Sequence, residues 1–166
     1  LMGTPGVETF LYGVVTRANV AHMNDYVDSV AALKPVSHKP TVIFSGMKPA
    51  GNTSEDMDRI FLPLSESAAA IRDAIDRGRE VGVGVGFKNI PNCLMPGYEG
   101  YNLDAYLIES EFNLITGAYG GSVGSDRKKN GRSCQKCRWN EPCTGVFSEY
   151  TEKMGWSEFE AGGVRR

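Results

Sequence analysis

The sequence predicts an α/β protein with parallel strands and a small cysteine-rich extension. Two apolar segments of strand length, 7–15 and 41–45, are separated by one helical segment, which is the arrangement of a βαβ unit. A valine and glycine alternation at 81–87 predicts a third strand. Three of the four cysteines lie between Cys134 and Cys143, so the end of the chain is expected to form a compact knuckle.

The βαβ unit is predicted from the order of its residues. Segment 7–15 reads VETFLYGVV, which is rich in β-branched and aromatic residues and favours a buried strand. A turn over 16–21 follows, and Asn24 is placed to cap a helix that ends before Pro35. The apolar residues of this helix recur at three-to-four spacing and are Met23, Val27, Val30, Ala31 and Leu33. The second strand, TVIFS, is then parallel to the first.

The next elements lead from the second strand to the third. A polar loop over 47–58 leaves the carboxyl end of the second strand, where parallel α/β folds bind ligands. We expect Ser65 to cap a second helix that ends at Gly78. The third strand, 81–87, presents valines on one face and bare backbone on the other, which predicts close packing against the glycines. Its glycines lack the GxGxxG spacing of a phosphate-binding loop.

The remainder of the chain is less regular. Residues 89–100 are predicted to form a loop, 102–115 an amphipathic segment of helix or strand, and 117–133 a linker. No internal repeat is visible.

Charge and hydropathy exclude several classes of protein. The chain has 166 residues, with 18 Lys and Arg against 20 Asp and Glu, so a net charge of −2 gives no long-range attraction for nucleic acid or anionic lipid. No apolar segment approaches the roughly 20 residues that span a bilayer. We therefore expect a cytoplasmic protein with neither nucleic acid nor membrane as a partner, and a chain that is one piece of a longer protein.

The cysteines are the strongest functional signal. Cys134 and Cys137 form a CxxC pair, and Cys143 follows in WNEPC, so three thiolates can face one metal centre. Cys93 is the remaining cysteine that can complete a four-sulfur site, although it can also be a free buried thiol. Spacing alone leaves zinc and an iron–sulfur cluster open. A disulfide framework is disfavoured, because nothing in the sequence indicates secretion.

Other polar residues have two readings each. Gly145 either turns the backbone so that N–H groups face the sulfurs or is an ordinary turn glycine. His22 and His38 are expected at the surface, and Glu109 and Glu111 either share a strand face or are simply solvated. Six cations surround the cysteines and form either a solvated loop or a patch that offsets cluster charge or binds an acidic partner; they are Arg127, Lys128, Lys129, Arg132, Lys136 and Arg138. No Ser-His-Asp, HExxH or Walker pattern supports a hydrolase.

One family has these features in the same order. GVVTRAN after the first strand, MKPAGN after the second, NIPNC after the third and then CQKCRWNEPCTGVFSEYTEKMGWSEF resemble the carboxyl-terminal half of radical S-adenosylmethionine enzymes with an auxiliary iron–sulfur extension of the twitch or SPASM kind. The resemblance implies the second half of a partial (β/α)6 barrel in 1–80 and the extension in 81–166. It also implies S-adenosylmethionine as cofactor and an auxiliary [4Fe–4S] cluster on Cys93, Cys134, Cys137 and Cys143.

Two departures limit what the resemblance implies. The CxxxCxxC motif of the catalytic [4Fe–4S] cluster is absent, so that cluster is expected on a missing amino-terminal half. Phe147 stands where the larger SPASM extension has a further cysteine, so one auxiliary cluster is implied.

The resemblance also suggests contacts and partners. Thr16, Asn19, Pro49 and Gly51 would flank S-adenosylmethionine, and a ferredoxin or flavodoxin would supply electrons for a 5′-deoxyadenosyl radical that abstracts hydrogen from substrate. The residues do not choose between peptide and small-molecule substrates. The rival hypothesis is a zinc-binding interaction module with four cysteine ligands and no catalytic activity.

Overall fold

The computed structural model describes residues 8–34, 39–49, 57–104, 128–129, 131–140, 143 and 145–159. This part of the chain is a mixed α/β fold around a three-stranded sheet, which confirms the α/β class. The strands are β1 (Phe10–Val14), β2 (Thr41–Ser45) and β3 (Val85–Lys88), all parallel and in the spatial order β1-β2-β3. Tyr12 pairs with Ile43, and Ile43 with Gly86.

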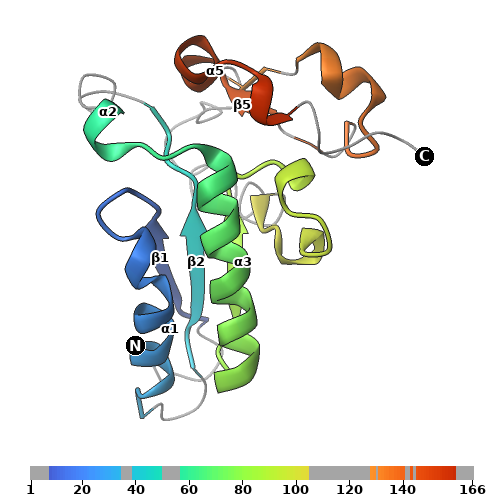
Figure 1. The fold of residues 1–166 in the computed structure, drawn as a ribbon. Coiled ribbons are helices and arrows are strands. Elements are labelled where there is room, and N and C mark those ends of the chain that lie inside the picture. Colours follow the sequence, from blue (N-terminus) through green and yellow to red (C-terminus); the bar gives the residue numbers. More distant parts are fainter. Residues whose placement is uncertain are drawn as a thin grey trace, which may run out of the picture.

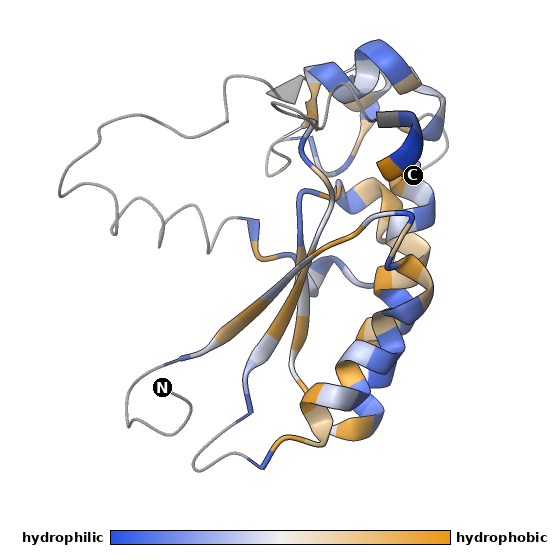
Figure 2. Ribbon diagram, turned by 90° about the vertical axis from the view of Figure 1, so that its left-hand side faces the viewer, coloured by the Kyte–Doolittle hydropathy of each residue, from blue (hydrophilic) through white to orange (hydrophobic). Residues whose placement is uncertain are grey.

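The crossover helices lie on one face of this sheet (Figures 1 and 2). Helix α1 (Met23–Ala31) connects β1 to β2, while α2 (Met57–Ile60) and α3 (Leu64–Val81) connect β2 to β3. The predicted βαβ unit is therefore present. Helix α1 buries Met23, Val27 and Val30, which belong to the apolar stripe predicted from the sequence.

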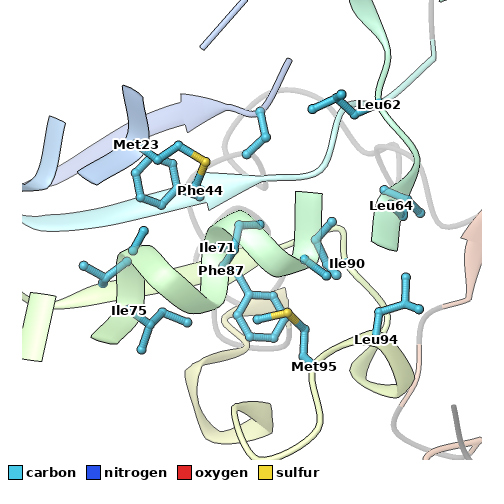
Figure 3. Packing of buried hydrophobic residues seen from close by; sticks show 14 of the residues in the cluster. Met23, Phe44, Leu62, Leu64, Ile71, Ile75, Phe87, Ile90, Leu94 and Met95 are labelled. Atoms are coloured by element: carbon cyan, nitrogen blue, oxygen red, sulfur yellow. The ribbon is translucent and has the colours of Figure 1, made fainter. Parts of the chain in front are cut away.

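Apolar side chains from α1, α3 and the strands meet in one cluster between helices and sheet (Figure 3). Phe44 of β2 and Phe87 of β3 face Ile71 and Ile75 of α3, and Phe87 and Ile71 have no solvent exposure. Burial of this apolar surface is the main force that holds the helices against the strands.

Several predicted helix and strand boundaries were wrong. Helix α1 begins at Met23 with His22 at the N-cap rather than Asn24, because a 3₁₀ turn over Val20–His22 leads directly into the helix. Helix α3 continues past Gly78 to Val81 and ends at Gly82, whose φ of 69° is the left-handed conformation typical of a helix C-cap. The third strand consequently starts at Val85 rather than at residue 81.

Gly78 is buried inside α3 because the helix lies close to the strand that follows. A Cβ atom placed there would stand 2.5 Å from Cγ2 of Val85 and 2.7 Å from the carbonyl oxygen of Val83. Gly86 confirms the close packing predicted for the glycine face, since a Cβ there would lie 2.5 Å from Cδ1 of Leu103. These glycines serve packing between elements.

The cysteine-bearing part of the chain forms a small lobe, defined here as the described residues within 128–159. It contains an antiparallel pair, β4 (Lys128–Lys129) and β5 (Val146–Phe147), followed by helix α5 (Ser148–Met154). Short 3₁₀ helices cover Arg132–Lys136 and Ser157–Phe159. Figure 1 places this cysteine lobe beyond the carboxyl ends of the parallel strands.

The cysteine lobe is attached to the amino-terminal end of α3. The backbone N–H of Leu64 donates to Oη of Tyr150 at 2.8 Å, and that of Ser65 donates to Oε2 of Glu158 at 2.7 Å. The Tyr150 hydroxyl in turn donates to Oε1 of Glu158. Ser65 was predicted to cap this helix, and that was wrong: residues 86 and 93 positions away satisfy the free N–H groups instead.

No helix among the described residues is both long and apolar enough to cross a membrane. Gly51, His38, Glu109 and Glu111 lie outside the described residues, as do most of the segment expected at 102–115 and of the linker expected at 117–133.

Candidate metal centre

The four cysteines surround one pocket at the junction of the sheet and the cysteine lobe. Cys93 comes from the 3₁₀ turn Asn92–Leu94 that follows β3, whereas the other three come from the lobe. All four thiols are free, and each is half-buried. The pocket lining is mostly apolar and comprises Pro91, Cys93, Cys134, Cys137, Trp139, Asn140, Cys143, Gly145, Val146 and Phe159. The fold thus brings Cys93 to a sequence-distant trio.

Tight turns direct the three lobe cysteines to this pocket. The N–H of Cys137 donates to the carbonyl of Cys134 at 2.9 Å, which closes the CxxC segment into a single 3₁₀ turn. The N–H of Cys143 donates to the carbonyl of Trp139 at 2.9 Å, so the chain returns to the pocket within one further turn. The CxxCx5C spacing is therefore long enough for two successive turns around one centre.

Backbone N–H groups point at two of the sulfurs. Trp139 N lies 3.4 Å from Sγ of Cys137, and Gly145 N lies 3.3 Å from Sγ of Cys143. Gly145 has a φ of 82°, a conformation that favours glycine and that turns its N–H back to the cysteine. Of the two readings of Gly145, the structure thus favours the turn that aims an N–H at sulfur. Such N–H groups stabilise negative charge on thiolates.

The sulfurs are close enough to affect each other's ionisation. Burial is the largest cause, followed by the charges of Cys137, Cys143 and Cys134, and together they raise the pKa of the Cys93 thiol to about 12. A thiolate at Cys93 therefore requires a compensating positive charge. A bound metal ion or iron cluster supplies that charge and holds coordinating thiols deprotonated.

The cysteines line a pocket rather than meeting at a point. Among the residues that the structure describes, no group of three or more His, Cys, Asp or Glu side chains is arranged to hold a single metal ion. The pocket lining nevertheless contains all four sulfurs and no histidine or carboxylate. Thiolate-only donor sets suit soft metal centres, namely zinc and iron–sulfur clusters.

The residues expected to flank a nucleoside lie at the carboxyl ends of β1 and β2. The Asn19 side chain accepts from the N–H of Thr16 at 2.8 Å and donates to the carbonyl of Val14 at 2.8 Å. These bonds fasten the turn after β1 and explain Asn19 without a ligand. Pro49 is buried beyond β2. Ligand binding by Thr16, Asn19, Pro49 and Gly51 stays a prediction.

The basic residues beside the cysteines differ in environment. Arg132 and Lys136 are exposed, whereas Arg138 pairs with Glu99 at 2.8 Å and stacks over the ring of Trp139. Arg127 lies outside the described residues. His22 is exposed beside Asp25, as expected of a surface histidine.

Five pocket residues were not found by sequence reasoning, namely Pro91, Trp139, Asn140, Val146 and Phe159. Trp139 and Asn140 stand between Cys137 and Cys143 in the sequence. Their position between two candidate ligands could have indicated that they line the same pocket. Phe159 lies in the 3₁₀ helix that follows α5 in the sequence, and no local pattern indicates that it reaches the cysteines.

Comparison of the chain with protein-family models, with curated proteins and with solved structures finds no significant match.

Proposed function

We propose that this chain is the carboxyl-terminal part of a radical S-adenosylmethionine enzyme and that Cys93, Cys134, Cys137 and Cys143 bind an auxiliary [4Fe–4S] cluster. The observation that carries the proposal is the pocket lined by all four cysteines at the carboxyl end of a parallel sheet. A four-thiolate set is the usual ligand set of such a cluster.

The sheet supports the barrel part of this proposal. Consecutive strands lie side by side, and the crossover helices α1 and α3 cover one face only. A (β/α) barrel is wound in this way, with helices outside and the other sheet face toward the interior. Each half of a doubly wound sheet also has this local strand order. The sheet alone therefore does not distinguish the two folds, and the cysteine pocket is the observation that favours the radical S-adenosylmethionine enzyme.

The two candidate metal centres differ in the spacing of their sulfurs. A tetrahedral zinc ion with Zn–S bonds of about 2.3 Å holds its four sulfurs about 3.8 Å apart, around one point. A cubane places iron and sulfide between the cysteines, so that its ligands stand farther apart around a central volume. Four thiols that line one pocket supply the ligand count of either centre. Zinc remains the alternative that the experiment must exclude.

The proposal divides the chemistry between two parts of an enzyme. The cofactor supplies the radical, and the protein supplies binding, orientation and the surrounding charge. Because this chain has no CxxxCxxC motif, the catalytic cluster belongs to polypeptide outside it, with a ferredoxin or flavodoxin as reductant. Under this proposal, the described residues contribute part of the barrel wall and the auxiliary cluster site. They do not select a substrate.

Anaerobic reconstitution with iron and sulfide tests the metal centre. The wild-type chain is expected to take up about four irons and absorb near ~400 nm, as clusters with thiolate ligands do. Cys137→Ser should lose most of this iron, because it removes one of four ligands. Ser133→Ala is the matched control, because it changes the residue before Cys134 and removes no cysteine. A colourless wild-type chain with one zinc would overturn the cluster and establish the zinc module.

A second measurement tests the proposed division of the chemistry between this chain and the rest of the enzyme. The reconstituted chain, reduced with dithionite in the presence of S-adenosylmethionine, is expected to form no 5′-deoxyadenosine, because the catalytic cluster is not on this chain. Formation of 5′-deoxyadenosine by this chain alone would contradict the proposed division.

A further inference from the structure

The two parts of the cysteine pocket reach it from different directions. Cys93 sits on the loop after β3, and its three partners sit on the cysteine lobe more than forty positions later in the sequence. A four-sulfur site requires these two segments to keep a fixed spacing. The contacts that join them therefore decide whether the site is formed.

The segment 89–101, called the Cys93 loop here, is held on one side by α3. Arg72 donates to the carbonyl of Leu94 at 2.7 Å, directly beside Cys93. The Tyr98 hydroxyl donates to Asp76 at 2.6 Å. A third bond joins the same helix to the end of the loop, from Nε of Arg79 to Oη of Tyr101 at 2.7 Å. Three side-chain hydrogen bonds thus join the loop to α3.

An ion pair connects this loop to the segment between the lobe cysteines. Arg138, the residue after Cys137, donates to Oε1 of Glu99 at 2.8 Å. The other Glu99 oxygen accepts from the N–H of Gly97 at 2.9 Å, which fixes the carboxylate on the loop. The Glu99 side chain is 17% exposed and that of Arg138 58% exposed. The Arg138 guanidinium also lies 5.0 Å from the ring centre of Trp139, which lines the pocket.

We infer that Arg138 and Glu99 are positioning residues that set the distance between Cys93 and the three lobe cysteines. This inference rests on the proposed function and deepens it. Glu99 is anchored to the loop that carries Cys93 by its bond to Gly97. Arg138 directly follows Cys137 in the chain, and its guanidinium stacks on the ring of Trp139. The pair therefore couples the two halves of the site at the point where they face each other.

The electrostatic effect of the pair is distinguishable from its positioning effect. Because the pair is neutral as a whole, removing Arg138 and removing Glu99 change the local charge in opposite directions. A charge effect would move the reduction potential of a bound cluster up in one variant and down in the other. A positioning effect weakens the same site in both variants and adds nothing further in the double variant, because the contact is already broken.

Cluster retention by the reconstituted chain tests the inference. Arg138→Ala, Glu99→Ala and the double variant should each lose the cluster to an iron chelator about tenfold faster than the wild type, the effect typical of residues that orient metal ligands. Arg138→Lys should recover part of the retention, since lysine keeps the charge but not the fork of donors. Arg132→Ala is the matched control, because it removes an exposed cation beside Cys134 and should behave as the wild type.

Two results would overturn the inference: single variants that hold the cluster as the wild type does, or potentials that shift in opposite directions with unchanged retention. A metal-free measurement separates its failure from that of the proposed function. A short bifunctional thiol reagent should join Cys93 to the lobe cysteines in the metal-free wild type and in Arg132→Ala, with a several-fold lower yield in Arg138→Ala and Glu99→Ala. If the wild type takes up no metal, the proposed function fails, and equal yields in all variants then reject the positioning role too.

Discussion

In the sheet and helices of residues 8–88, apolar side chains meet in one buried cluster, whereas the cysteine lobe has two-residue strands and a helix of seven residues. Val27, Val42, Ile71 and Phe87 of the first region have no solvent exposure. The lobe contributes few residues to that cluster, such as Val146, Tyr150 and Phe159. The first region can be stabilised by apolar burial, but the second is too small to rely on a core of its own.

The comparison indicates that the lobe depends on its attachments. It is fixed by the bonds from Leu64 and Ser65 to Tyr150 and Glu158 and by the ion pair of Arg138 with Glu99. Under the proposed function, a metal centre on the four cysteines would add to these attachments. Small domains commonly use a bound metal for this purpose, so that metal binding and folding are coupled. The sheet and helices should then be insensitive to metal, and the lobe should not.

The largest expected effect on stability comes from the core. Ile71→Ala leaves a cavity at a position of α3 that is fully buried, and should lower the free energy of unfolding by about 2–5 kcal/mol. Urea unfolding followed by circular dichroism measures this. Asp73→Ala, at an exposed position of the same helix, should change stability by no more than about 0.5 kcal/mol. Equal effects of the two substitutions would contradict the described core.

A smaller effect is expected where the lobe meets α3. Tyr150→Phe removes the hydroxyl that accepts from Leu64 N–H and donates to Glu158, at a cost of about 1–3 kcal/mol for the polar groups left unpaired. Hydrogen exchange should accelerate in residues 148–159 and at the start of α3, and stay unchanged in β1 and β2. Tyr26→Phe, which changes an exposed tyrosine of α1, is the control. Faster exchange throughout the chain would show that the two regions do not differ in the way described.

The smallest effect is the pH dependence of the same contact. Burial of Tyr150, and then its hydrogen bond to Glu158, raise the pKa of the phenol above its ordinary value of 10. Since the folded state disfavours the ionised phenol, this contribution is complete below pH 10 and is lost as the pH rises above it. The stability difference between wild type and Tyr150→Phe should therefore shrink above pH 10. A difference that stays constant to higher pH would reject this source of stability.

Local sequence patterns predicted the structural features that depend on residues a few positions apart. The segment VETFLYGVV predicted a strand that exists as β1, although the expected burial was wrong because Tyr12 and Val14 are exposed. The spacing of Met23, Val27 and Val30 predicted the buried face of α1. These predictions succeed because side-chain period and β-branching act over a few residues. The predicted end of α3 failed because packing against the following strand decided it. Gly78 would end a helix on its own, but its lack of a side chain is used to pack α3 against Val85.

The sequence by itself determined the parallel strands, the apolar helix faces and the turns that group Cys134, Cys137 and Cys143, because each depends on neighbours in the chain. Only the tertiary structure decided that Cys93 joins them, that Glu99 meets Arg138, and that Tyr150 satisfies the N–H of Leu64. These contacts join residues 39 to 86 positions apart. No periodicity or motif encodes such pairs, because they form only when the sheet, α3 and the lobe have packed together.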